Sequence, residues 1–416
     1  MNAAGEPSGP PADPARPSLR RLGAAPHRLM FFAGATNIML AMIWWAAWLV
    51  HARWPKAIPL HYPPVYPGWL HAFLMQYQVL PSFIFGFLLT TFPKWTKQPD
   101  VARRRFIPVG VAMMLGQLAT LAGALDSRTL VVVGVGLTLV GWLAAISALM
   151  PMLWREEGTT WHARSCVGAL VLGCAGLVAF LAYLLGASQS WVPASIKLGS
   201  FGMLLMVFFT VAHRMFPFFA GGTVPGYKPW RPMWLLAAMW VGVLVHLVLA
   251  LAPARRWLWI PDGALAVVVS YAWWRWWPRG PKPGLLTVLF VALAWLPIAM
   301  VLFAIDDIAF ARNGLAWLGL APAHAMFIGF FGSAMVAMVT RVTQGHSGRP
   351  LVMPAVAWFT FIAIQVVAVV RIIADQTSDP YAWLAIAAIG WLVAFAPWIV
   401  RVGRIYLSPR ADQRPG

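Results

Sequence analysis

Residues 71–95 read His-Ala-Phe-Leu-Met-Gln-Tyr-Gln-Val-Leu-Pro-Ser-Phe-Ile-Phe-Gly-Phe-Leu-Leu-Thr-Thr-Phe-Pro-Lys-Trp, with no formal charge before Lys94. The run is long enough to cross a bilayer as a helix, which takes about 20 apolar residues. On a helical period, His71, Met75, Gln78 and Ser82 share one face. Lipid offers that face no hydrogen-bond partner, so it must point to other helices, a cofactor or a water-filled cavity.

The composition extends this prediction to the whole chain. Of its 416 residues, 61% are hydrophobic and only 10% are charged, whereas about 25% are charged in soluble domains. Apolar runs of about 20 residues recur from residue 28 to residue 403. The sequence therefore predicts an all-α, polytopic bundle of transmembrane helices, with the lipid bilayer as its first partner.

Twelve spans are predicted, and they divide the chain into three parts. Residues 1–26, rich in Ala, Pro and Gly, form a predicted disordered cytoplasmic tail. Residues 27–404 form the twelve-helix membrane domain, and residues 405–416 a short cytoplasmic tail. The predicted spans are 28–50, 68–92, 106–125, 129–150, 162–186, 192–218, 232–252, 256–277, 285–305, 314–341, 351–375 and 380–403.

The distribution of basic residues tests this topology independently. With the N-terminus inside, 23 of the 31 Lys and Arg residues fall on inner segments and 8 on outer ones, as the positive-inside rule requires. The triplet Arg103-Arg-Arg105 is the strongest indication. Both termini are therefore predicted to be cytoplasmic, and the net charge of +19 needs no nucleic-acid partner.

Catalytic chemistry, if any, must lie within the bundle, because the loops are short and carry no Gly-rich phosphate loop. Four histidines fall within predicted spans: His71, His213, His246 and His324. Imidazole is a common ligand of haem iron and copper, and haem sites in bundles use inward-facing histidines. The alternative for each is a histidine that is hydrogen-bonded to a neighbouring helix.

Counting from the basic residues that follow, His71 and His324 are predicted at different depths. His71 precedes Lys94 by 23 residues and His324 precedes Arg341 by 17. If both basic residues mark the inner interface, His324 lies about 9 Å deeper at about 1.5 Å per residue. A single bis-histidine haem does not follow from the sequence.

An acidic pair and a methionine pair within the predicted spans each have a structural and a functional interpretation. Asp306-Asp307, near Arg312, is either an interfacial ion pair or an entry site for a proton or cation. Met335 and Met338, three residues apart below His324, are either packing residues or soft ligands for copper.

Three segments together resemble the NnrS family of bacterial membrane proteins. They are the 71–95 stretch, Arg214-Met-Phe-Pro-Phe-Phe219, and Thr340-Arg-Val-Thr-Gln-Gly-His-Ser-Gly-Arg-Pro-Leu351. The third is the most specific, because it fixes Arg, Gly, His, Gly and Arg at set spacings after a span. The resemblance covers the second to the eleventh span and agrees with twelve spans.

The resemblance implies haem and copper as cofactors, a multi-pass location in the bacterial inner membrane, and protection from nitric oxide or a derived nitrogen species. His71, His324 and His213 are then the candidate ligands. Arg341 and Arg349, with His346 between them, would form a cytoplasmic motif that pairs with haem propionates. The alternative is an ordinary positive-inside loop with glycine turns. The family pattern His-Ala-His-Glu-Met is altered here, because Phe73 and Leu74 stand where a histidine and a glutamate are expected.

Two further comparisons bear on function. Haem–copper oxidases and nitric oxide reductases carry ligand histidines on spans two, six, seven and ten, the spans that hold His71, His213, His246 and His324 here, which is an analogy only. The alternative function is a cofactor-free secondary transporter, which predicts two related halves; no six-span repeat is visible. Whether the protein is an enzyme, a sensor, a transporter or a metal-handling protein stays open at this stage, as does its oligomeric state.

Overall fold

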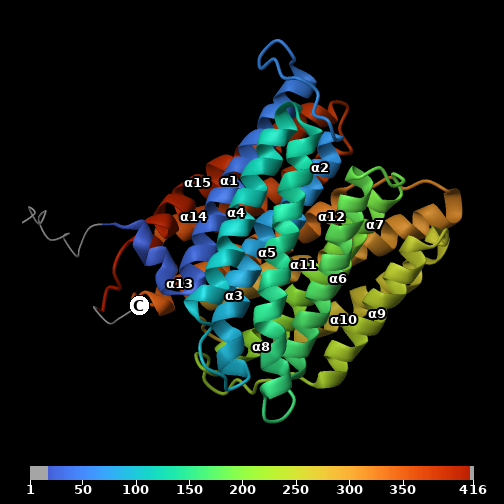
Figure 1. Cartoon of the computed structure of the whole chain (residues 1–416). Helices are drawn as coiled ribbons and strands as arrows, with labels where there is room; N and C mark the ends of the chain where they lie inside the picture. The colour runs from blue at the N-terminus through green and yellow to red at the C-terminus, as the bar shows by residue number, and fades with distance from the viewer. Residues whose placement is uncertain (1–16, 413–416) are drawn as a thin grey trace, which may run out of the picture.

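The predicted helical bundle is confirmed by the computed structural model, which describes residues 17–412 (Figure 1). No strand occurs in that range. Nine of the twelve predicted spans are single α-helices: α1 (Pro26–Arg53), α4 (Arg103–Asp126), α5 (Arg128–Arg155), α6 (Trp161–Leu184), α9 (Met233–Leu251), α10 (Trp259–Trp276), α11 (Gly284–Asn313), α14 (Ala355–Ala374) and α15 (Pro380–Leu407).

The other three spans, the second, sixth and tenth, share an unusual construction. Each is an α-helix that widens into a π-helical segment and then returns to α-helix. They are α2 (Pro67–Phe73), η2 (Leu74–Val79) and α3 (Leu80–Trp95); α7 (Trp191–Lys197), η3 (Leu198–Leu205) and α8 (Met206–Gly221); and α12 (Ala321–His324), η5 (Ala325–Gly332) and α13 (Ser333–His346). Since π-helical turns are rare and frequent at functional sites, three at matched places mark these spans as special.

These three spans are also the most deeply buried. Of the most apolar part of each, 89%, 72% and 72% is buried, against at most 56% in the other candidate spans. The polar face predicted for residues 71–95 thus points into protein: Gln78 and Ser82 are fully buried. We call these three the central spans.

The π-helical segments recur at almost equal intervals along the chain. They end at Val79, Leu205 and Gly332, which are 126 and 127 residues apart. The chain is therefore built from three successive groups of four spans, with the second span of each group in the centre. This period places His71-Ala and His324-Ala eight spans apart, and it differs from the two related halves that a transporter would have.

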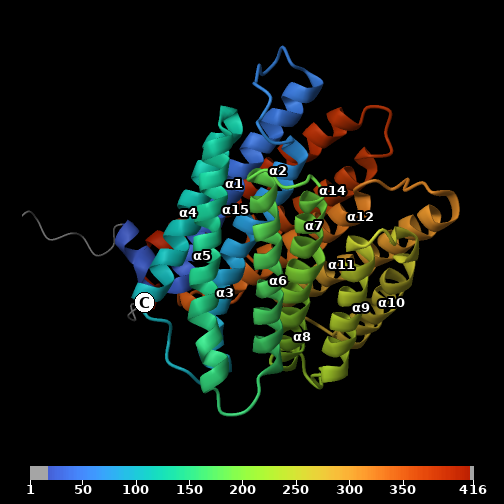
Figure 2. The ribbon, with the colours of Figure 1, turned by 45° about the vertical axis from the view of Figure 1, so that its right-hand side comes forward.

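The predicted span count needs one qualification. Eleven helices are long and apolar enough to cross a membrane; α10 is the exception, because Asp262, Arg275 and its tryptophans lower its hydropathy. It nevertheless packs beside α9 and α11 as a full partner (Figure 2). The shortest predicted loops separate the third span from the fourth and the seventh from the eighth. Each of these pairs consists of two distinct helices, with breaks at Ser127 and at residues 252–258.

The two ends of the described chain meet on one side of the bundle (Figure 1). Ser18 N–H donates to Leu407 O at 2.9 Å, and Arg28 donates to the carbonyls of Tyr406 and Ser408. The predicted disordered tail is thus too long: its part from Leu19 to Ala24 forms the 3-10 helix η1, held on α1 with Leu22 buried. Residues 1–16 and 413–416 lie outside the described range.

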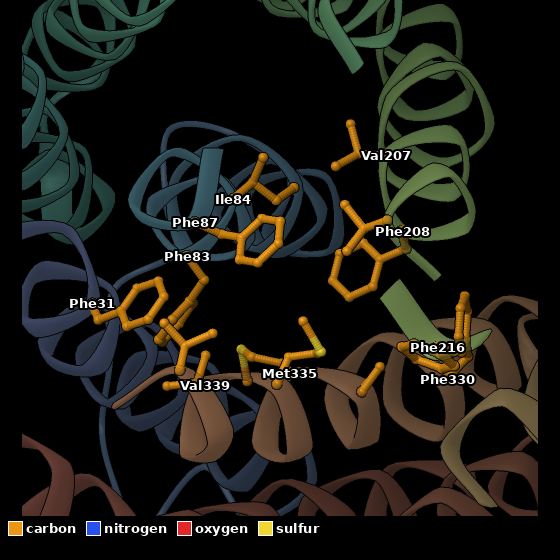
Figure 3. A pocket seen from close by; sticks show the side chains of 14 residues that line it. Phe31, Phe83, Ile84, Phe87, Val207, Phe208, Phe216, Phe330, Met335 and Val339 are labelled. Carbon is orange, nitrogen blue, oxygen red and sulfur yellow. The ribbon is translucent and has the colours of Figure 1, made fainter. Parts of the chain in front are cut away.

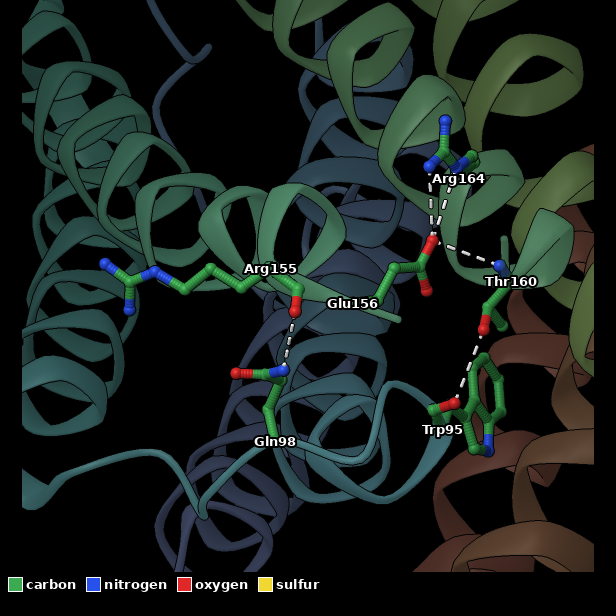
Figure 4. Close-up of polar contacts among 6 residues, drawn as sticks. All are labelled: Trp95, Gln98, Arg155, Glu156, Thr160 and Arg164. Atoms are coloured by element: carbon green, nitrogen blue, oxygen red, sulfur yellow. Dashed lines mark hydrogen bonds and ion pairs between the residues drawn. The ribbon is translucent and has the colours of Figure 1, made fainter. Parts of the chain in front are cut away.

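One inner loop ties three helices together (Figure 4). The carboxylate of Glu156 accepts hydrogen bonds from Thr160 N–H at 3.0 Å and from Arg164 at 3.3 Å. Thr160 donates its hydroxyl to Trp95 O, and Gln98 donates to Arg155 O at 3.1 Å. The inner end of the second span is thereby fixed to α5 and α6.

Helices α4 and α5 pack closely through small residues, as is common in membranes. A Cβ added at Gly134 would lie 2.4 Å from the backbone nitrogen of Thr120, so α4 would have to move away. A Cβ added at Gly136, on the same helix, meets nothing within 4 Å.

Gly134→Ala should therefore destabilise the protein by about 1–3 kcal/mol, the usual cost of overpacking, and lower the midpoint of thermal unfolding in detergent. Gly136→Ala is the matched control and should leave the midpoint unchanged or raise it, because alanine favours helix. Equal midpoints for the two variants would contradict the close packing of α4 and α5.

Candidate functional site

Two imidazoles of different central spans lie near one another at the outer end of the bundle. His71 belongs to α2 and His324 to α12; both are partly exposed and within electrostatic range of each other. Arg371 of α14, only 7% exposed, is within electrostatic range of both rings and pairs with Asp375 at 3.0 Å. Two imidazoles and one buried guanidinium therefore form the candidate site.

The hydrogen bonds define which ring nitrogens are free. His324 Nδ1 lies 3.0 Å from Leu320 O, and a carbonyl only accepts, so Nδ1 carries the proton and the neutral ring keeps its lone pair on Nε2. Histidines that bind metals usually donate their other N–H in this way. His71 stacks on Trp45 with ring centroids 4.3 Å apart and planes at 11°, and its buried Nδ1 has no partner among the described residues.

The prediction that His324 lies about 9 Å deeper than His71 assumed that Arg341 marks the inner end of its span, and this assumption was wrong. That residue does not mark the inner end of its span, because α13 continues to His346. Its guanidinium instead lies 3.9 Å from the centre of the Phe219 ring. Measured to the helix ends at Trp95 and His346, the offset is two residues, or about 3 Å.

The repeated π-helical segments also place His71 and His324 at equivalent positions in their spans. His71 precedes the end of its π-helical segment by eight residues, and so does His324. In the second group of spans, the residue at this position is Lys197. The three groups thus carry histidine, lysine and histidine at equivalent positions.

The two residues that replace the family's His-Glu pair are packed into the core. Phe73 is buried and stacks on Phe180 with centroids 4.4 Å apart, and Leu74 is fully buried. Neither side chain offers an atom that could bind a metal. His71 is therefore the candidate metal ligand that remains in this stretch.

His213 is separate from the pair. Its Nδ1 lies 2.8 Å from His162 Nε2, and its Nε2 lies 3.1 Å from Pro232 O. Since a carbonyl only accepts, Nε2 is the donor and Nδ1 accepts from His162, which leaves neither nitrogen free for a metal. His213 also lies 16 residues, or about 24 Å, further along its span than Lys197. The sequence did not suggest His162 as its partner.

The inner-loop residues expected to hold propionates are also distant. His346 follows His324 by 22 residues of continuous helix, about 33 Å, and it packs against His27 with ring centroids 4.5 Å apart. Burial and the nearby Arg401 lower the pKa of Arg349. One haem cannot contact both ends, so Arg341, His346 and Arg349 do not belong to a site formed by His71 and His324.

An apolar pocket lies deeper between the three central spans and α1 (Figure 3). It measures about 590 Å³, including the part that is open to its surroundings. Phe83, Phe208 and Phe330 line it, together with Met335 and Met338. These methionines therefore face a shared apolar space, and neither lies beside a histidine of the site.

Buried amides form a polar zone, of which only Gln78 was predicted from the sequence. Gln78 donates to the hydroxyls of Thr120 and Thr138 at 2.9 and 2.8 Å, and Gln117 donates to Asn37 O. The side-chain oxygens of Gln76, Gln78, Gln117 and Asn37 are buried and have no partner among the described residues. The polar residues of α1 and α4 within apolar runs were the available indication of this zone.

The donor set fits haem better than a metal ion held by protein alone. Haem supplies four nitrogens itself and takes one or two axial ligands, which His324 Nε2 and a nitrogen of His71 can provide. No three His, Cys, Asp or Glu residues within 17–412 gather to hold a metal ion. The copper expectation therefore has no such ligand set in this part of the chain.

Comparisons with known proteins agree with this architecture. Nothing matches among curated protein sequences. Among solved structures, a haem–copper terminal oxidase dimer determined by cryo-electron microscopy matches with a TM-score of 0.61 at 10% identity, over 94% of this chain and 84% of that chain. At this identity, the likeness concerns the fold alone. Residues 21–410 match the family described as NnrS protein, and since this is nearly the whole chain, the protein belongs to the NnrS family.

Proposed function

We propose that this multi-pass membrane protein binds haem at its outer end, where His71 and His324 would hold the iron. The observation that carries the proposal is that His71 and His324, from different central spans, lie within electrostatic range of the same buried arginine, Arg371. The free Nε2 of His324 and the unpartnered Nδ1 of His71 support it further. A haem bound there would supply electron transfer.

The surrounding residues would hold that group in three ways. Trp45 fixes the plane of His71 by stacking. The Leu320 carbonyl fixes the tautomer of His324. Arg371 places a positive charge near both rings, where it can pair with a propionate and favour the reduced iron.

The biological role that we infer is a response to nitric oxide or a derived nitrogen species in the bacterial inner membrane. Nitric oxide is small and uncharged, so it enters apolar spaces. The pocket between the central spans is lined by apolar side chains and lies on the inner side of the histidines, which suits storage or passage of such a molecule. Copper, the second expected cofactor, would have to use sulfur ligands such as Met335 and Met338.

His324→Ala should abolish most of the Soret absorption of protein purified from haem-replete cells, because it removes the ligand whose Nε2 is free. His61→Ala, in an exposed outer loop, is the control and should keep the full absorption per polypeptide. Wild-type protein without a Soret band would refute the haem proposal, and a cofactor-free transporter would then be favoured.

Arg371→Gln should lower the midpoint potential of the bound haem by tens of millivolts, roughly the effect of one charge at an effective dielectric constant of about 20. Loss of a nearby positive charge stabilises the ferric over the ferrous state. Arg312→Gln removes an exposed charge from an outer helix end and should leave the potential unchanged. Equal shifts in the two variants, measured by redox titration, would place the haem elsewhere.

A further inference from the structure

A second buried polar cluster lies at the outer ends of α9, α10 and α11, remote in sequence from His71. It consists of His246, Asp262, Asp306 and Asp307, each at most 6% exposed. The sequence suggested a lone histidine and an interfacial acid pair beside Arg312. The structure brings these residues into one cluster, with Arg255 as the ion-pair partner at 3.9 Å from Asp306.

Both carboxylate oxygens of Asp306 have partners. Its Oδ1 accepts the Leu318 N–H at 2.9 Å, and its Oδ2 faces Arg255. The guanidinium of Arg255 also lies over the Phe310 ring at 4.1 Å. A carboxylate with a backbone donor and a cation is stable in its ionised form.

Asp262 and Asp307 differ, because they face each other. Asp262 Oδ1 lies 2.6 Å from His246 Nδ1, and its buried Oδ2 has no hydrogen-bond partner among the described residues. The Asp307 carboxyl lies close enough to Asp262 to interact with it directly. Two ionised carboxylates only accept hydrogen bonds and repel each other. The contact is favourable only when one of the two carries a proton.

A count of charges gives the same result. The charged or titratable groups that face the cluster are His246 from α9, Asp262 from α10, Asp306 and Asp307 from α11, Arg255 from η4 (Arg255–Trp257) and Lys197 from α7. With the three carboxyls ionised and Arg255 and Lys197 charged, these five groups carry one net negative charge. One added proton makes the cluster neutral, which is the favoured state for buried groups at membrane depth.

The cluster is also joined to a central span. The Phe201 ring of η3 stacks on His246 with centroids 3.8 Å apart. Lys197, which occupies the position equivalent to His71 and His324, donates to Ala250 O at the end of α9 and is within electrostatic range of Asp307. A change of charge in the cluster therefore acts directly on the sixth span.

We propose that His246, Asp262 and Asp307 form a proton-binding site that takes up and releases one proton at the outer face of the membrane. Uptake converts the Asp307 carboxylate to a carboxylic acid that donates its O–H to Asp262, while His246 holds the other oxygen of Asp262. Release returns the proton to the outer water past Arg255, which is half exposed. The site requires no haem and is independent of the function proposed above.

Infrared difference spectra of the full-length protein in detergent, recorded between low and high pH, test this site. The wild type should show the carbonyl stretch of a buried carboxylic acid, and the band should shift to lower frequency in D₂O. Asp307→Asn and Asp262→Asn should each remove the band. Asp306→Asn is the matched control and should retain it, because Asp306 already has Arg255 and the Leu318 N–H as partners.

Three results would overturn the proposal. One is a wild-type spectrum without this band throughout the titration, which decides the question even if a variant fails to fold. Another is loss of the band in Asp306→Asn together with its retention in Asp307→Asn. The third is disappearance of the band on adding NaCl at constant pH, which would identify the cluster as a sodium site instead.

Discussion

A bilayer gives polar groups no hydrogen-bond partner, and this constraint organises the whole protein. Many intramembrane polar side chains lie on the three central spans or on faces that touch them, and others, such as His246 and Asp262, bond to each other. Gln78, for example, bonds to hydroxyls of α4 and α5 instead of meeting lipid. The outer spans can then be apolar towards the bilayer. Whatever chemistry the protein performs is therefore confined to the interior of the bundle.

The three groups of four spans have three equivalent positions, and these positions carry different residues. His71 and His324 keep an imidazole, with Arg371 near both. The second group carries Lys197, which turns to α9 and towards the acidic cluster around Asp262. One architecture thus provides a two-histidine site in one place and a charge-balanced carboxyl site in another. The shared π-helical segments are what set these positions level with each other.

The polarity of the bundle interior also changes from the outer end to the inner end. The titratable groups of both proposed sites lie at the outer end. Below them, between the central spans, the pocket lined by Phe83, Phe208 and Met335 is apolar. Basic residues dominate the predicted inner side, where Arg28 fixes the end of α15. This gradient suits an uncharged small molecule in the core and proton exchange with the outer water.

The sequence alone determined the helical class and nearly all of the spans, because hydropathy and periodicity are local properties. It also predicted the orientation, from positive-inside bias, and the candidates His71 and His324. It could not establish which polar residues meet. His213 was a candidate ligand until His162 was found against it, and Asp306-Asp307 was assigned to Arg312 instead of Arg255. The depth of His324 also depended on where α13 ends. Such pairings join residues from separate helices, so only the packing of those helices decided them.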